Sequence, residues 1–272
     1  MAVEFLSLQP RMPLACFIET IRDFEAPARA YGLERVLPVP GAGLILNLSE
    51  DQTRVYDEAL NCTRFSAMTL DGPRTRSQII DTEEQVAVMG VVFRPGGAAR
   101  FFRERMDVLV NGSVDLEALV GRQAPLLREQ LLEAGSALRR LALLTHWLQQ
   151  RGPAPRACGA IGHALSTLDA TPSIGALTTT ARQLGWSPRT LGERFRQQVG
   201  LTPKRYLRLR RFQQVLKASE RNSTRVDWAG LALDCGYHDQ AHLAHEFREF
   251  AGLSPTAYSR QRGPWSSHVA LP

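Results

Sequence analysis

The chain has 272 residues, 44% of them hydrophobic and 22% charged, which is ordinary for a soluble globular protein of two domains. Its net charge of +6 is uneven: residues 153–272 carry sixteen Lys and Arg against eight Asp and Glu, and residues 1–152 carry seventeen against nineteen. No run approaches the roughly 18 apolar residues that span a bilayer, and no signal-peptide pattern is present, so we expect no membrane protein.

The basic C-terminal part indicates a polyanion as its partner, although a basic face can also be plain solvated surface. The four cysteines are isolated and include no CxxC pair, which favours a reduced, cytoplasmic protein. They are Cys16, Cys62, Cys158 and Cys235.

Residues 1–110 show short apolar runs separated by turns that contain Gly, Pro and Asp. Many short strands without long helices between them are typical of a β-barrel or a jelly-roll-like unit. The predicted strands are residues 35–39, 44–48, 54–56, 66–70, 78–81 and 87–93.

Helices are predicted after the break at Pro95-Gly-Gly, first a short one over 98–105 and then 115–120, 124–133 and 137–150. The last is rich in leucine and either packs on its own barrel or pairs with a second chain, so monomer and homodimer both stay open. Arg151-Gly-Pro-Ala-Pro is the clearest linker. We therefore divide the chain into domains at 1–151 and 156–262, with 263–272 as a tail.

The C-terminal part contains an internal repeat. It reads L-x-x-T-A-x-x-L-G-W-S from Leu177 and W-x-x-L-A-x-x-C-G-Y-H from Trp228, an offset of 51 residues. After one extra residue in the second copy, the match continues at an offset of 52 as far as Tyr206 and Tyr258. The spacing of the apolar residues places them on one stripe of a short helix in each copy.

Each copy then carries the signals of a turn and a second helix. Gly185 and Gly236 stand where a left-handed C-cap is needed, and Ser187 and Asp239 are predicted N-caps of the next helix. Helix, glycine turn and capped helix together predict two helix-turn-helix units, at about 177–199 and 228–251.

The second helix of each unit divides by spacing into a buried stripe and an outward stripe. The buried stripes are predicted to be Leu191, Phe195, Val199, Leu243, Phe247 and Phe250. Outward Arg, Gln and His side chains can hydrogen-bond base edges in the major groove, although a solvated face is the alternative for any single residue. The helix from 203 to about 219 joins the units, and its basic residues either reach phosphates or pair with carboxylates. The predicted DNA contacts are Arg189, Thr190, Glu193, Arg196, Lys204, Arg205, Gln240, His242, His245 and Arg248.

Residues 157–262 resemble the C-terminal domain of the AraC/XylS family of transcription regulators. The closest agreement is Gly236-Tyr-His-Asp-Gln-Ala-His-Leu-Ala-His-Glu-Phe followed by Gly252-Leu-Ser-Pro-Thr-Ala-Tyr. The resemblance implies seven helices, with a long helix between two units that enter successive major grooves. It also implies that the first unit often makes the more sequence-specific contacts. Thr180 replaces the family's large aliphatic residue, so we expect a slightly under-packed core in the first unit.

The N-terminal half is similar to the sensor domains of one AraC-like subgroup. The fragments that carry this likeness are Arg35-Val-Leu-Pro, Leu44-Ile-Leu-Asn-Leu, Gly72-Pro-Arg-Thr-Arg and Val91-Val-Phe-Arg-Pro-Gly-Gly-Ala. The resemblance implies binding of a small molecule, dimer formation, or both. Arg74, Arg76 and Arg94 are candidates for an anionic effector, with surface or intradomain ion pairs as the alternative.

Metal and enzyme chemistry have little support. His238, His242 and His245 lie close together, yet no further ligand converges on them, so we expect no metal. Cys16 and Cys62 lack the context of a reactive thiolate, and no phosphate loop, G-x-S-x-G or H-E-x-x-H is present. We expect neither an enzyme nor a cofactor.

The sequence thus predicts an α+β protein of two domains. The first is a β-barrel or jelly-roll-like sensor domain with strands to about 94 and helices after 97, and the second is an all-α double helix-turn-helix. We expect an effector-responsive regulator that binds specific double-stranded DNA and contacts RNA polymerase. The alternative is a ligand-binding or protein-interaction module whose helix-turn-helix pair no longer binds DNA specifically.

Overall fold

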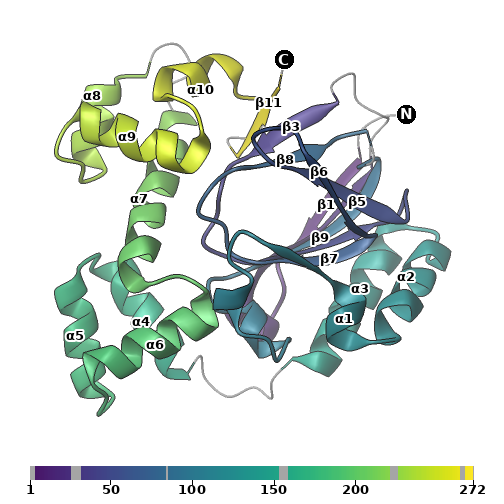
Figure 1. The fold of residues 1–272 in the computed structure, drawn as a ribbon. Coiled ribbons are helices and arrows are strands. Elements are labelled where there is room, and N and C mark those ends of the chain that lie inside the picture. The colour runs from purple at the N-terminus through teal and green to yellow at the C-terminus, as the bar shows by residue number, and fades with distance from the viewer. Residues whose placement is uncertain are drawn as a thin grey trace.

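The computed structural model describes residues 4–25, 32–83, 85–152, 159–220, 226–263 and 267–271, apart from the side chain of residue 174. A β-rich N-terminal part lies beside a helical C-terminal part (Figure 1). The predicted α+β architecture is therefore confirmed. Most of the expected linker, from residue 153 on, lies outside the described residues.

Two antiparallel sheets form the β-rich part, with the orders β1-β2-β9-β4-β7-β10 and β11-β3-β8-β5-β6. The described strands thus make a jelly-roll-like pair of sheets and not one closed barrel. Their bounds are β1 (Glu4–Leu8), β2 (Ile18–Glu25), β3 (Leu33–Val36), β4 (Gly43–Asn47), β5 (Gln52–Tyr56), β6 (Cys62–Ser66), β7 (Met68–Asp71), β8 (Gln78–Asp81), β9 (Ala87–Phe93), β10 (Ser113–Asp115) and β11 (His268–Ala270).

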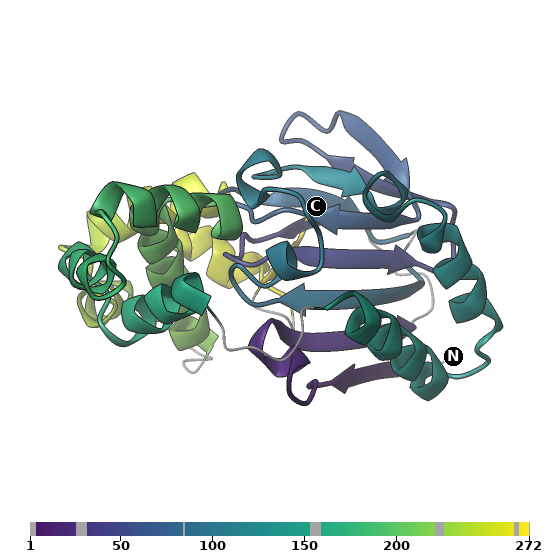
Figure 2. The same ribbon diagram turned by 90° about the horizontal axis from the view of Figure 1, so that it is seen from below.

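Three helices follow the strands and cover one sheet: α1 (Leu116–Val120), α2 (Gln123–Glu133) and α3 (Ala137–Arg151). Figure 2 shows them lying against the strands, and α3 contacts β1 and β2. Leu141, Leu144 and Leu148 recur at helical spacing and are buried in the same core as the strands. The Arg140 guanidinium also donates two hydrogen bonds to the Asp23 carboxylate, at 2.7 and 2.9 Å. The leucine-rich helix therefore packs on its own sheet.

In the described part of the C-terminal half, seven helices form the all-α domain that the sequence predicted. Helix α7 runs between two helical groups, and Figure 1 shows α4–α6 at one of its ends and α8–α10 at the other. The bounds are α4 (Gly159–Ala170), α5 (Ile174–Gln183), α6 (Pro188–Val199), α7 (Pro203–Glu220), α8 (Trp228–Asp234), α9 (Gln240–Ala251) and α10 (Pro255–Gln261).

One hydrophobic core holds these helices together. Phe212 of α7 contacts Phe247 and Phe250 of α9, with ring centroids 5.1 and 5.2 Å apart. On the other side, Phe195 of α6 meets Tyr206 of α7 edge to face at 5.6 Å. Such aromatic pairs add to the apolar area that each ring buries. Helix α7 is thus the common packing partner of both second helices.

Three expectations from the sequence need correction. The predicted helix over 98–105 is only a short 3₁₀ turn, η2 (Ala98–Arg100), and the chain after it buries both Phe101 and Phe102 in the core. Strands β1, β2, β6 and β10 were not predicted. The segment expected as a plain tail includes β11, which pairs with β3 of the N-terminal part.

Candidate nucleic-acid interface

The first helix-turn-helix unit consists of α5 and α6. Gly185 has φ +67°, the left-handed conformation that the turn after α5 requires. The Ser187 hydroxyl then accepts the backbone N–H of Thr190 at 3.0 Å and caps α6, whose first residue is Pro188. These residues aim α6 away from α5, as predicted from the sequence.

Helix α6 buries one stripe and exposes the other. Leu191, Phe195 and Val199 are buried, as predicted. Arg189 lies near the start of the opposite stripe with its side chain 88% exposed, and its Nε donates to Glu193 at 3.0 Å. A base or a phosphate can replace that partner, because an exposed ion pair contributes little to stability.

Thr180 lies in the core of the first unit. It is buried, and its hydroxyl donates to the Ala176 carbonyl oxygen at 3.0 Å. The polar group is therefore satisfied inside α5. Ala181, next to it, is fully buried, as expected for a residue where two helices pack closely.

The second unit repeats this design with α8 and α9. Gly236 has φ +76°, and the Asp239 carboxylate accepts the backbone N–H of His242 at 2.7 Å to cap α9. Leu243, Phe247 and Phe250 are buried, as predicted.

The outward face of α9 is largely open. Gln240, His245 and Arg248 are exposed, whereas His242 is half-buried with its ring edge-on to Tyr237 at 5.2 Å. Gln240, His245 and Arg248 therefore have the freedom to reach a ligand, and His242 is held in a fixed orientation. Among the described residues, no three His, Cys, Asp or Glu side chains are placed to hold a metal ion.

The arginines of α7 divide into two groups. Arg208 pairs with Glu246 and Glu249 of α9, Arg211 also reaches Glu246, and Arg210 pairs with Asp169 of α4. These ion pairs fix α4 and α9 to α7. Lys204 and Arg205 are exposed and make no ion pair with any described residue. The sequence could not separate the residues of α7 that form ion pairs from those that are free to contact phosphates. The partner of Arg208 and Arg211 is Glu246, which falls between the outward and buried stripes of α9.

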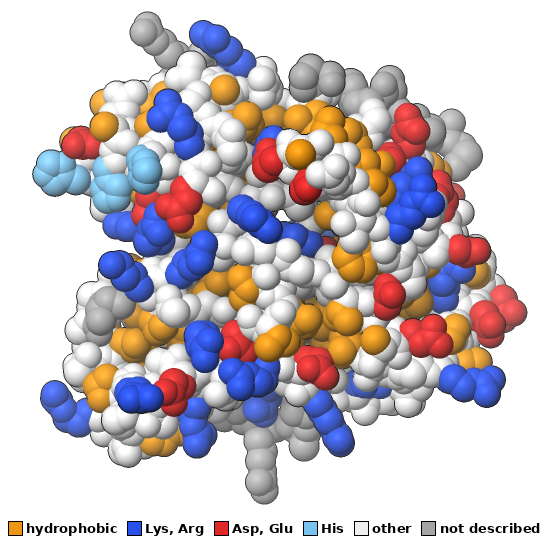
Figure 3. All heavy atoms as spheres, in the orientation of Figure 1, with side chains coloured by type: hydrophobic (Ala, Val, Ile, Leu, Met, Phe, Trp, Pro, Cys, Tyr) orange, Lys and Arg blue, Asp and Glu red, His pale blue; other side chains and the backbone are white. Residues whose placement is uncertain are grey.

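The surface of the helical part carries the basic groups of the two units together. Figure 3 shows Lys, Arg and His side chains on the helical side of the molecule, flanking an indentation of the surface between the two helical groups. A concave, positively charged surface attracts a polyanion.

The C-terminal end of α6 contacts the N-terminal part. Arg196 Nη1 lies 3.1 Å from the Asp107 carboxylate, which belongs to η3 (Met106–Val108) and is also bound by Arg105. A Cβ on Gly200 would lie 2.9 Å from the Met106 carbonyl oxygen, so the contact is close-packed. The outward stripe of α6 is thus open at its start, whereas at its end Arg196 is ion-paired with Asp107 and still 47% exposed.

The C-terminal end of α9 is held in a similar way. The Ser77 backbone N–H donates to the Phe250 carbonyl oxygen at 2.9 Å, and the Ser77 hydroxyl accepts from Arg35 Nη1 at 2.8 Å. Arg35 pairs with Glu58 and lies against Gly252, where a Cβ would meet its Nη1 at 2.8 Å. Both second helices therefore end on the N-terminal part.

The three arginines proposed for an anionic effector do not meet in a cavity. Arg74 is mostly buried, donates to Ser113 Oγ at 2.9 Å and lies 4.0 Å from Asp71. Arg76 is exposed, and Arg94 donates to the Ala15 carbonyl oxygen at 3.0 Å. Arg74 and Arg94 thus make contacts within the N-terminal part.

Residues 180–261 match a family described as a helix-turn-helix domain, and residues 6–115 match a domain of unknown function (DUF6597). Over 78 residues the chain is 38% identical to the HTH-type transcriptional activator RhaS of Escherichia coli strain SE11 and of Escherichia coli O157:H7. These matches span 28% of this chain and only 26% of the relatives' own length.

Two solved structures with similar architecture are wild-type ToxT of Vibrio cholerae strain SCE256 with bound unsaturated fatty acid and ToxT of Vibrio cholerae O395. Each has a TM-score of 0.44 and 8% identity, and 94% of this chain aligns with 94% and 97% of those chains.

In the described residues, no helix has the length and apolar character needed to cross a membrane.

Proposed function

Because this chain is a member of the AraC/XylS family through its C-terminal helix-turn-helix domain, we propose that it is a transcription regulator that binds specific sequences of double-stranded DNA. The observation that carries the proposal is the pair of capped second helices, α6 and α9. At the N-terminal end of each helix the outward side chains are exposed to solvent.

The spacing of the two units supports binding to successive major grooves. Helix α7 has 18 residues, a length of roughly 27 Å at about 1.5 Å per residue. Helix α6 packs on α7 at Tyr206 and α9 packs on it at Phe212, and Figure 1 shows the two units as separate groups along α7, an arrangement that suits one helix in each of two neighbouring grooves.

The outward residues divide into two proposed roles. Arg189, Gln240 and Arg248 are suited to base edges, since Arg and Gln make paired hydrogen bonds to guanine and adenine. Lys204 and Arg205 at the start of α7 are suited to phosphates, which any cation can contact. The same two helices also carry Glu193, Thr190, His242 and His245, which complete the proposed contact surface.

We also propose that the N-terminal part makes DNA binding responsive to a small molecule and that the DNA-bound protein contacts RNA polymerase. Support comes from the placement of the N-terminal part, because it holds the C-terminal ends of both α6 and α9. A change in that part would act directly on the orientation of both helices.

Selection of bound duplexes from a random pool, followed by footprinting, tests the proposal. We expect a reproducible sequence and protection over roughly 16–20 base pairs on one face, given about 10 base pairs per turn. Binding without preference among sequences would instead support a protein-interaction module that has lost specific DNA recognition.

A further inference from the structure

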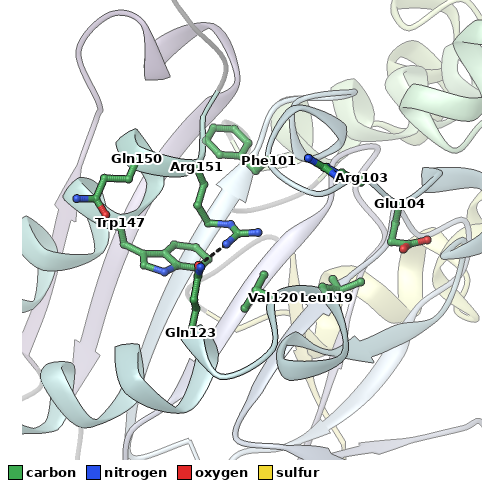
Figure 4. A pocket seen from close by; sticks show the side chains of 9 residues that line it. All are labelled: Phe101, Arg103, Glu104, Leu119, Val120, Gln123, Trp147, Gln150 and Arg151. Carbon is green, nitrogen blue, oxygen red and sulfur yellow. Dashed lines mark hydrogen bonds between the residues drawn. The ribbon is translucent and has the colours of Figure 1, made fainter.

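A cleft of about 560 Å³ opens between the C-terminal ends of α1 and α3 and the segment that follows η2. This volume is within the range of small-molecule sites. Its apolar lining comes from Phe101, Leu119, Val120 and the Trp147 indole, and Figure 4 shows these side chains around one opening. None of the arginines that the sequence suggested for an effector lines it.

Arg151 supplies an unsatisfied cation in this cleft. Its guanidinium lies 5.0 Å from the Trp147 ring centroid, and its Nη1 donates to Gln123 Oε1 at 2.6 Å (Figure 4). Its Nε is buried without an acceptor, and no carboxylate among the described residues pairs with the group. Burial accordingly lowers the pKa of Arg151. The side chain as a whole is half-buried, so its charge, which has no carboxylate partner among the described residues, can pair with an anion that enters the cleft.

The remaining polar groups set the charge of the ligand. Arg103 and Arg151 are opposed by one carboxylate, Glu104, so the cleft carries a net charge of +1. Glu104 lies at the end of the cleft away from Arg151 (Figure 4). A carboxylate has one negative charge, which balances the charge of the cleft, and its planar shape matches the N–H groups of a guanidinium. A phosphate dianion would carry more negative charge than the cleft balances.

We propose that this cleft binds a small organic monocarboxylate with an apolar body. The carboxylate accepts hydrogen bonds from Arg151, and the body packs against Trp147, Leu119 and Val120. The inference rests on the proposed effector response and assigns it a site and a ligand class.

The cleft is connected to the DNA-binding surface by a short path along the chain. Arg103 and Glu104 line the cleft, Arg105 follows directly, and Arg105 binds Asp107, which in turn pairs with Arg196 of α6. A bound ligand therefore acts on the same segment that contacts α6.

Calorimetry on the full chain without DNA tests the site, with 3-phenylpropanoate as probe and its uncharged amide as matched control. We expect saturable binding of the anion, weaker by at least about tenfold for the amide, because a charge-assisted hydrogen bond is lost. Arg151→Gln should weaken the anion to a similar extent, whereas Arg139→Gln, an exposed arginine near the other end of α3, should leave its affinity unchanged.

Gln123→Glu keeps the test decisive if Arg151→Gln does not fold. It places a carboxylate beside Arg151 Nη1, so it should stabilise the protein while abolishing anion binding. Equal binding of anion and amide, no saturable binding at millimolar probe, or undiminished binding to Gln123→Glu would each overturn the proposal. DNA is absent, so these outcomes are separate from a failure of sequence-specific DNA binding.

Discussion

At the scale of single residues, Arg189 and Lys204 are both exposed cations, yet their positions differ. Arg189 is the second residue of α6 and Lys204 is the second residue of α7, so they differ in the helix that presents them. We expect the start of α6 to face the floor of the groove that it enters and the start of α7 to face the sugar-phosphate backbone.

Arg189→Ala should therefore reduce affinity for the selected duplex by about 1–3 kcal/mol and relax the preference for one base pair. Lys204→Ala should weaken all duplexes about equally and reduce the salt slope of log K by about 0.9. Titration of the selected duplex and single-base variants over a salt series measures both effects. A uniform loss for Arg189→Ala would show that this residue contacts the backbone.

Glu246 is a buried charged residue of α9 that the sequence did not reveal. Its side chain is 2% exposed and pairs with Arg208 and Arg211, which are themselves partly exposed. Removing one member of a buried ion pair leaves the opposite charge unpaired. Here solvent and Glu249 offset part of that loss for the two arginines.

Glu246→Gln should lower the free energy of unfolding by about 1–3 kcal/mol, since it weakens charge-assisted hydrogen bonds at a buried position. Glu193→Gln is the matched control, because its ion pair with Arg189 is exposed and should contribute less than about 1 kcal/mol. Urea unfolding of both variants gives the comparison. Equal stability of the two would contradict a structural role for Glu246.

At the scale of secondary-structure elements, the caps decide where the second helices begin. Ser187→Ala removes the acceptor for the Thr190 N–H and should cost about 1 kcal/mol. Ser187→Asp keeps an acceptor and should retain the stability of the natural chain. Thermal or urea unfolding of both variants distinguishes capping from a simple effect of side-chain size, which would lower the stability of both.

The elements of the C-terminal half could be predicted because their signals are local. Gly185, Gly236, Ser187 and Asp239 each act within one turn of their own helix, and the apolar stripes repeat at helical spacing. The apolar buried stripes of α6 and α9 followed from these signals alone.

Other elements depend on partners far away in the chain and so escaped prediction. Strand β2 carries Asp23 at a buried position, which only the distant Arg140 makes favourable. Strand β11 is three residues long and forms only because β3 offers a free edge. The pairing of Arg196 with Asp107 likewise joins residues 89 positions apart. No local pattern reports such contacts.

At the scale of the whole molecule, Asp107 of the N-terminal part pairs with Arg196, which we predict to contact DNA. The hydrogen bond from Arg105, and the charges of Arg105 and Arg196, hold the pKa of the Asp107 carboxyl below its usual range. A depressed pKa means that the contact is present at neutral pH and is lost only as the pH falls through that lowered value.

Asp107→Asn should therefore release Arg196 to a phosphate and steepen the salt slope of log K by about 0.9. In that background Arg196→Ala should restore the original slope, whereas in the natural chain Arg196→Ala should leave the slope nearly unchanged. The four proteins of this double-mutant cycle are compared at pH 7 on one duplex. An equal effect of Arg196→Ala in both backgrounds would mean that Asp107 does not hold this arginine.

Strand β11 joins the end of the DNA-binding domain to the five-stranded sheet. Val269 is 1% exposed and lies in the helical core together with Leu37. The Leu37 N–H donates to the Ser267 carbonyl oxygen at 2.8 Å, and the Leu271 N–H donates to the Leu33 carbonyl oxygen at 3.1 Å. The chain after α10 therefore fastens the second helix-turn-helix unit to the N-terminal part.

Val269→Asp should detach this strand, because burial of a valine contributes about 1.5–3 kcal/mol and an unpaired charge opposes it. Hydrogen exchange at Leu37 should accelerate by at least about tenfold, since every 1.4 kcal/mol is a factor of ten. The core amides of α9 should stay protected, because that helix has its own aromatic core. Ala270→Ser, at the neighbouring half-buried position, should leave both rates unchanged. If Leu37 stayed protected in Val269→Asp, the two domains would be joined by the Ser77 and Arg196 contacts without any contribution from β11.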